Sequence, residues 1–135
     1  MRLVLDSSVA LAWCFTDGRN PKTLALLEQV IEIGAIVPSL WRYEIANGLI
    51  LAQRRKRIDD ARRLAFLAEL GQFDITVDRT PEGDPWFAAS SLAALHGLTV
   101  YDAAYLEIAQ RNRLPLATLD KALASAAVEA GVAVL

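Results

Sequence analysis

Four acidic residues stand where carboxylates could act together: Asp6, Glu44, Asp102 and Asp120. Each follows a short apolar segment and lies at or near the start of a predicted helix. Carboxylates that converge repel one another, and the cost is high unless a cation joins them. Oxygen ligands suit Mg²⁺ or Mn²⁺, and one His and one Cys in the whole chain cannot form a zinc cluster. The pattern predicts a divalent cation site of the kind that acts on phosphates, and four acids are enough for a two-metal scheme.

The first and last of these acids follow strands of the kind that is buried in a parallel sheet. The apolar run 2–5 ends at Asp6, and the apolar run 116–118 precedes Asp120. Open α/β sheets place their sites at the carboxyl ends of the strands, so neighbouring strands would bring Asp6 and Asp120 side by side. The alternative is that each aspartate merely caps the helix that follows it.

The other two acids belong to helices. Glu44 lies one turn into a predicted helix over 40–57, which follows a predicted strand over 35–37. Asp102 is the predicted N-cap of a helix that runs to residue 112. The alternatives are an exposed first-turn acid favoured by the helix dipole for Glu44, and a simple cap for Asp102. Gly48, in mid-helix, costs about 1 kcal/mol relative to alanine, which indicates that a neighbouring group approaches closely there.

The remaining elements alternate between helix and strand. We expect further helices over 7–15, 21–33, 59–70, 85–96 and 121–130, and strands over 73–77 and 132–135. Turn formers fill 80–85. This alternation predicts a single α/β domain over 1–135, with a central, mostly parallel sheet flanked by helices on both faces.

Composition limits the setting in which the chain works. An apolar share of 54% excludes a disordered chain, and the longest apolar run, residues 9–15, is far short of the ~20 residues that span a bilayer. No basic leader precedes Asp6, and the single Cys14 rules out an internal disulfide, so we expect a cytoplasmic protein that does not enter a membrane. The net charge of −2 means that any surface for nucleic acid must be local. Arg54, Arg55 and Arg57 are candidates, although they could equally be a solvated helix end.

Several stretches together resemble a known family. They are LVLDSSVALAW, VPSLWRYEIANGL, LTVYDAAYLEIAQRNRLPLATLDKAL and the closing AGVAVL. The chain resembles the PIN-domain ribonucleases, and within them the VapC-like toxins of type II toxin–antitoxin pairs. The resemblance implies Mg²⁺-dependent cleavage of RNA by metal-activated water, with Mn²⁺ as a substitute. It implies catalytic Asp6, Glu44, Asp102 and Asp120, of which Asp6, Asp102 and Asp120 hold metal, with Ser7 and Thr118 as supporting polar residues.

The implied partners are an RNA substrate and a VapB-like antitoxin. The high apolar fraction predicts a homodimer, and the hairpin of the third and fourth predicted helices offers a groove for an antitoxin's C-terminal segment. Two other functions stay open. The chain could be another Mg²⁺-dependent phosphate enzyme, such as a phosphatase or a structure-specific DNA nuclease, or a non-catalytic interaction module. Haloacid-dehalogenase-type phosphatases carry D-x-D after the first strand, whereas Asp6 is followed by Ser7 and Ser8.

Overall fold

The computed structural model describes residues 2–79 and 84–135. The elements follow one another in the order β1 (Leu3–Leu5), α1 (Ser7–Cys14), the 3₁₀ turn η1 (Thr16–Gly18), α2 (Pro21–Ile33), β2 (Ala35–Val37), α3 (Leu40–Arg54), α4 (Asp60–Leu70), β3 (Ile75–Val77), the π-turn η3 (Pro85–Ala89), α5 (Ser90–His96), α6 (Val100–Asn112), β4 (Leu116–Ala117) and α7 (Lys121–Glu129).

The strands of the described chain form one parallel sheet in the order β3-β2-β1-β4. Val4 of the central strand β1 lies opposite Ile36 of β2 on one side and Leu116 of β4 on the other. The chain therefore builds β2 and β3 outward from one edge of β1 and returns to add β4 at the other edge. Such a reversal of strand order opens a crevice at the carboxyl ends of the two strands that flank it. The predicted parallel sheet is confirmed, and β1 and β4 are neighbours.

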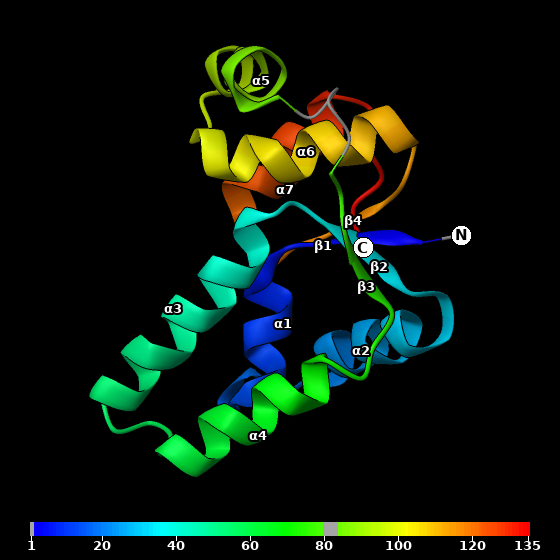
Figure 1. Ribbon diagram of the computed structural model, residues 1–135. Helices are drawn as coiled ribbons and strands as arrows, with labels where there is room; N and C mark the ends of the chain where they lie inside the picture. The colour runs from blue at the N-terminus through cyan, green and yellow to red at the C-terminus, as the bar shows by residue number, and fades with distance from the viewer. Residues whose placement is uncertain (1, 80–83) are drawn as a thin grey trace.

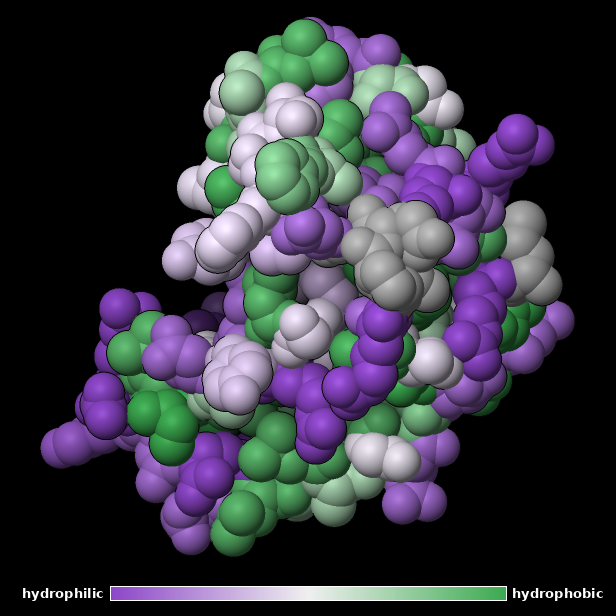
Figure 2. Space-filling model, turned by 45° about the horizontal axis from the view of Figure 1, so that its top comes forward, coloured by the Kyte–Doolittle hydropathy of each residue, from purple (hydrophilic) through white to green (hydrophobic). Residues whose placement is uncertain are grey.

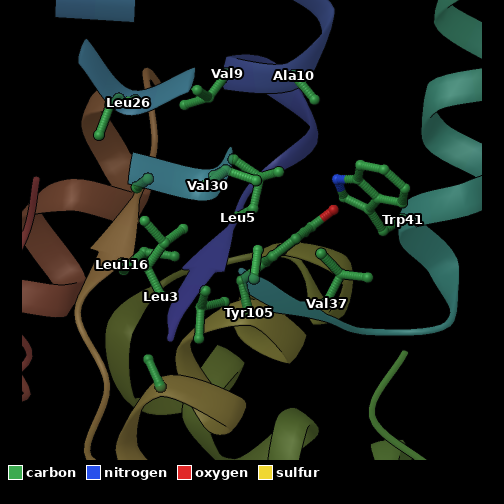
Figure 3. Close-up of a cluster of buried hydrophobic side chains, with 14 of the residues drawn as sticks. Leu3, Leu5, Val9, Ala10, Leu26, Val30, Val37, Trp41, Tyr105 and Leu116 are labelled. Atoms are coloured by element: carbon green, nitrogen blue, oxygen red, sulfur yellow. The ribbon is translucent and has the colours of Figure 1, made fainter. Parts of the chain in front are cut away.

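Helices cover both faces of the sheet. Helix α6 packs on β1 and β4, with α5 and α7 beside it, while α1 and α2 lie on the opposite face (Figure 1). Side chains on both faces of β1 are fully buried, which explains why the strand is a continuous apolar run rather than an alternating one. Leu3, Leu5, Leu116 and Tyr105 of α6 belong to one buried cluster, in which the Tyr105 side chain extends toward Trp41 of α3 (Figure 3). None of the helices in the described ranges is long and apolar enough to cross a membrane.

Helices α3 and α4 form the predicted hairpin, which projects from the body of the protein (Figure 1). Helix α3 ends at Arg54 and not at residue 57 as predicted. Lys56 adopts a left-handed conformation (φ 61°), and the Arg57 N–H donates to the Ala52 carbonyl at 2.9 Å, which closes the helix. The expected close approach at Gly48 is confirmed, because a Cβ there would lie 2.7 Å from Leu11 Cδ1 of α1.

Two predicted strands are wrong in extent. Strand β3 begins at Ile75, two residues later than expected. The predicted strand 132–135 forms only a single parallel bridge, between Leu116 and Val134. Its backbone bonds to the sheet go to Leu116 of the two-residue strand β4, whereas the Val132 N–H donates to the Ala127 carbonyl of α7. Of the predicted loop 80–85, residues 80–83 lie outside the described part of the chain.

Candidate functional site

Asp6 follows β1 directly and is only 4% exposed. It stands at the N-cap of α1, but its side chain makes no capping hydrogen bond, so the interpretation of Asp6 as a simple cap is wrong. Its Oδ2 atom instead accepts two hydrogen bonds, from Ser8 Oγ at 2.6 Å and from Thr118 Oγ1 at 2.7 Å. The donor Thr118 follows β4, so this carboxylate is tied across the carboxyl ends of the neighbouring strands β1 and β4.

Asp120 lies just beyond β4, at the same edge of the sheet. It caps α7, because its Oδ1 accepts from the Leu123 N–H at 3.0 Å. Its own N–H donates to Thr118 Oγ1 at 3.0 Å. The buried Thr118 hydroxyl therefore links Asp120 to Asp6, and the expected proximity of the two acids is confirmed.

Asp102 is not the N-cap of α6, contrary to the prediction. The cap is Thr99, whose Oγ1 accepts from the Asp102 N–H at 3.1 Å. The helix therefore begins at Val100, and Asp102 is the third residue of its first turn. A Thr three residues before an acid is itself a helix-start pattern. The consequence is that the Asp102 carboxylate has no capping task in its own helix.

Glu44 is the fifth residue of α3, so it lies inside the helix, just past its first turn. One of its carboxylate oxygens, Oε1, accepts a hydrogen bond from the Tyr105 hydroxyl of α6. The Ser7 side chain at the start of α1 also favours the ionised form of this carboxylate and so lowers its pKa. Glu44 is thus tied to α6 and α1, which carry or adjoin the other acids.

The four carboxylates share one electrostatic environment. Burial raises the pKa of Asp6, and the Asp120 charge raises it further. Burial likewise raises the pKa of Glu44, with added repulsion from Asp6 and Asp102. The pKa of Asp102 is raised by burial first, then by Asp120 and Asp6. No Lys, Arg or His within residues 2–79 and 84–135 forms an ion pair with any of the four. The site is therefore a cluster of mutually repelling acids held by neutral donors.

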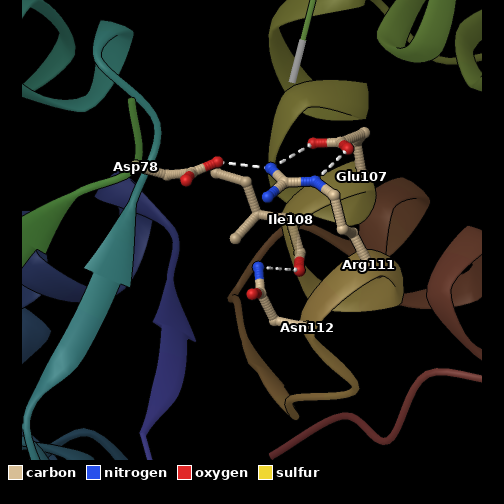
Figure 4. Close-up of polar contacts among 5 residues, drawn as sticks. All are labelled: Asp78, Glu107, Ile108, Arg111 and Asn112. Carbon is tan, nitrogen blue, oxygen red and sulfur yellow. Dashed lines mark hydrogen bonds and ion pairs between the residues drawn. The ribbon is translucent and has the colours of Figure 1, made fainter. Parts of the chain in front are cut away.

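An ion network fixes the far end of α6. Arg111 binds Glu107 through Nε at 2.7 Å and Nη2 at 3.0 Å, and its guanidinium also pairs with Asp78, just after β3 (Figure 4). Both carboxylates are nearly buried. This network joins α6 to the edge strand β3. At the other end of α6 the surface is hollowed, between the α3–α4 hairpin and the lobe formed by α5 and α6 (Figure 2).

The chemistry of the donors fits a hard divalent cation. All four acids are carboxylates, and a cation would favour the ionised form, which burial and then mutual repulsion disfavour in three of them. In the described residues no three Asp, Glu, His or Cys side chains are arranged so as to hold a metal ion as they stand. Mg²⁺ does not need such a cage, because it keeps several waters and uses one or two carboxylates.

The basic run lies away from the acids. Arg54 and Arg55 are exposed at the end of α3, about 15 Å from Glu44 at 1.5 Å per residue. Arg57 is engaged within the protein: it pairs with Asp17 at 2.9 Å, and its guanidinium lies 4.1 Å from the centre of the Phe15 ring. The structure does not bring these arginines into the acidic cluster.

Three functional contacts were not predicted from the sequence. Ser8 donates to Asp6, Tyr105 donates to Glu44, and Arg111 joins Glu107 to Asp78. Only the Glu107–Arg111 pair carried a local signal, a charge pair four residues apart on one helix. Ser7 and Thr118, which were predicted as supporting residues, do contact the acids.

Comparisons with known proteins find relatives over nearly the whole chain. The family model described as PIN domain matches residues 3–129. Ribonuclease VapC3 of Pyrobaculum aerophilum is 32% identical over 124 residues, which cover 92% of this chain and 93% of that protein. The crystal structure of PAE2754 from the same organism is similar with a TM-score of 0.71 at 25% identity, over 93% of this chain and 84% of that one. FitAcB from Neisseria gonorrhoeae shares the fold, with a TM-score of 0.68 at 21% identity over 98% and 96% of the two chains.

Proposed function

Because the chain belongs to the PIN-domain family, and within it to the VapC-like ribonucleases, we propose that it is a Mg²⁺-dependent endoribonuclease and the toxin of a type II toxin–antitoxin pair, acting in the cytoplasm. The observation that carries the proposal is the acidic cluster, whose carboxylates repel one another and have no cationic partner in the described chain. Acids that converge lower the stability of the folded protein, so a cluster of them without a cation indicates a site that binds one.

Asp6, Asp102 and Asp120 are the residues that would hold Mg²⁺, with Mn²⁺ as a substitute. When bound, the cation lowers the pKa of water and offsets negative charge on the phosphate. Glu44 differs from these three because Tyr105 already occupies one of its oxygens. Its other oxygen could accept hydrogen bonds from waters that a bound cation keeps, so we assign Glu44 to taking the proton of the attacking water. Ser7 and Thr118 keep the acids in place.

RNA would reach the acids along α3. A protein with a net charge of −2 needs a local cationic surface to bind a polyanion. Arg54 and Arg55 provide exposed charge on the hairpin. Arg57 can join them only if RNA competes with Asp17 for its guanidinium. We therefore expect Arg54 and Arg55 to contribute more to RNA affinity than Arg57.

The proposed assembly is a homodimer with a VapB-like antitoxin. Large apolar side chains are exposed on neighbouring elements, among them Trp86 and Phe87 of η3, Leu95 of α5 and Tyr101 of α6. Such groups on a monomer favour a protein interface. An antitoxin arginine that reached the acids would pair with them by charge-assisted hydrogen bonds and would exclude both cation and RNA. A monomer by light scattering at high micromolar concentration would contradict the dimer.

The reaction is tested with purified, antitoxin-free protein and cellular RNA. We expect cleavage with Mg²⁺ or Mn²⁺, none with EDTA, and products that end in 3′-hydroxyl and 5′-phosphate, because water attacks the phosphorus. Asp102→Asn should be inactive, and Asp60→Asn, a first-turn acid of the distant helix α4, should cleave like wild type. Ends with 2′,3′-cyclic phosphate would show that the RNA's own 2′-hydroxyl attacks. Cleavage of DNA or of phosphate monoesters, but not of RNA, would show that the protein is a DNA nuclease or a phosphatase instead.

A further inference from the structure

Tyr105 has a ring that is buried in the core and a hydroxyl that donates to an acid of the candidate site, and burial of the ring alone does not explain the hydroxyl. Its side chain is 0% exposed, and its ring packs among the apolar side chains of the sheet (Figure 3). Its hydroxyl nevertheless points out of this core toward α3, the helix of Trp41, and donates to Glu44 Oε1 (Figure 3). A buried phenylalanine would fill the same space without a polar atom that needs a partner.

The hydroxyl links two elements that otherwise meet little. Helix α3 packs mainly on α1 and α4, and it extends into the projecting hairpin. Helix α6 carries Asp102, three residues before Tyr105 and on the same side of the helix. The Tyr105–Glu44 bond therefore couples the position of the acid on α3 to the helix that presents another acid.

Neighbouring groups do not replace this donor. Trp41, one turn before Glu44 on α3, has a buried Nε1–H with no hydrogen-bond partner in the described protein. Ser7 also lowers the pKa of Glu44, although the Tyr105 hydrogen bond lowers it more. A phenol is a neutral donor, so it can restrain Glu44 without neutralising the negative charge that a cation needs.

We propose that Tyr105 is a positioning residue of the acidic site, which from helix α6 holds the Glu44 carboxylate of α3 in place against the neighbouring acids. This inference rests on the proposed function, because it gives Tyr105 its role in binding a divalent cation and in the reaction. Residues that orient the groups around a metal typically change its affinity by 10–100-fold when they are removed.

The test is Tyr105→Phe, which keeps the ring and deletes only the donor. We expect Mn²⁺ to bind about 10–100-fold more weakly by titration calorimetry. The kcat for RNA should fall while KM stays that of wild type, because the hydroxyl contacts Glu44 and not the substrate. The matched control is Tyr43→Phe, an exposed tyrosine next to Glu44 on α3, which should bind Mn²⁺ like wild type.

A role in packing alone predicts a different result. Tyr105→Phe would then lower the free energy of unfolding and leave the affinity for Mn²⁺ unchanged. The double variant Tyr105→Phe/Glu44→Gln separates the two further. If Tyr105 acts through Glu44, adding Tyr105→Phe to Glu44→Gln should weaken Mn²⁺ binding no further, whereas additive losses would overturn the proposal.

A measurement on the wild-type protein covers the case in which Tyr105→Phe does not fold. The chain has three tyrosines, so ¹³C labelling at Cζ gives three signals, assigned with Tyr43→Phe and Tyr101→Phe. The Tyr105 signal should shift as Mg²⁺ saturates the site, and a fixed signal would overturn the inference. Wild-type protein that binds no cation and cuts no RNA would overturn the proposed function and this inference together. Wild-type protein that does both, with Tyr105→Phe unchanged, would overturn this inference alone.

Discussion

Replacing Asp102 by Asn distinguishes two explanations for an acid in the first turn of α6. If Asp102 is a first-turn acid favoured by the helix dipole, Asn should cost about 0.3–1 kcal/mol whether or not metal is present. If it belongs to a repelling cluster, its charge destabilises the metal-free protein, and Asn should stabilise it. Asn does not disturb the helix cap in either case, because the cap is Thr99. The two explanations therefore predict opposite signs in EDTA.

The magnitudes follow from the exposure of the site and from linkage. Because Asp102 is partly exposed, we expect Asn to add only about 0.5–1 kcal/mol in EDTA, or roughly 2–4 °C in Tm. For wild type, Mg²⁺ at 100 times its Kd should add about 2.7 kcal/mol, or roughly 10 °C. If losing this ligand weakens binding about a hundredfold, the same Mg²⁺ concentration should stabilise Asp102→Asn by only about 0.4 kcal/mol.

The sign of the pH dependence provides an internal check. The pKa of Asp102 is raised in the folded protein by burial and by Asp120 and Asp6, so the folded state binds its proton more tightly than the unfolded chain does. The destabilisation is therefore complete above the raised pKa and disappears as the pH falls below the unfolded value near 3.9. In EDTA, the advantage of Asn over Asp should be largest at neutral pH and should vanish toward pH 4 and below.

The assay is a set of thermal melts of wild type and Asp102→Asn, each with EDTA and with saturating Mg²⁺. Asp60→Asn is the matched control, because Asp60 is a first-turn acid whose pKa is lowered by Arg63. It should lose a little stability in EDTA and keep the full Mg²⁺ response. Equal Mg²⁺-induced shifts in wild type and Asp102→Asn, or a lower Tm of Asp102→Asn in EDTA, would refute the assignment of Asp102 to the cation site.

Two further substitutions test the supports of the site. Arg111→Met removes the guanidinium between two nearly buried carboxylates, Asp78 and Glu107, and should lower the free energy of unfolding by about 3–5 kcal/mol in urea; a loss below about 1 kcal/mol would contradict this role. Thr118→Val removes the hydroxyl that donates to Asp6 and should cost about 1–3 kcal/mol, with weaker Mn²⁺ binding, whereas Thr118→Ser should retain most of both. Equal behaviour of the Val and Ser variants would show that the hydroxyl does not matter.

The sequence predicted the parts of the site that depend on local pattern. A buried apolar run followed by an acid located Asp6 and Asp120 at strand ends, and the parallel sheet places such ends on one rim. The adjacency of β1 and β4 needed the whole fold, because strand order is decided by packing over more than 100 residues. The predicted N-cap of α6 was Asp102, whereas the cap in the structure is Thr99. Both residue types cap helices well, and here the Thr99 side chain caps the helix while Asp102 lies three residues on, as in a capping box.

The donors around the acids could not be predicted in the same way. Tyr105 lies 61 residues from Glu44, and Thr118 lies 112 residues from Asp6. A tyrosine in an apolar helix gives no sign of whether its hydroxyl ends in solvent or on a carboxylate. Only the tertiary packing of the ring decides this. The same holds for Arg111, whose partner Glu107 was local but whose partner Asp78 was not.

The identity of these donors explains how the protein keeps its acids together. The groups that bind Asp6 and Glu44 are hydroxyls of Ser7, Ser8, Tyr105 and Thr118, and all are neutral. An arginine there would stabilise the folded state more, as Arg111 does for Asp78 and Glu107. It would also satisfy the carboxylates permanently and leave no negative charge for a cation. Neutral donors fix the geometry and leave the repulsion among the acids in place, so a cation that bound there would gain the free energy of relieving it.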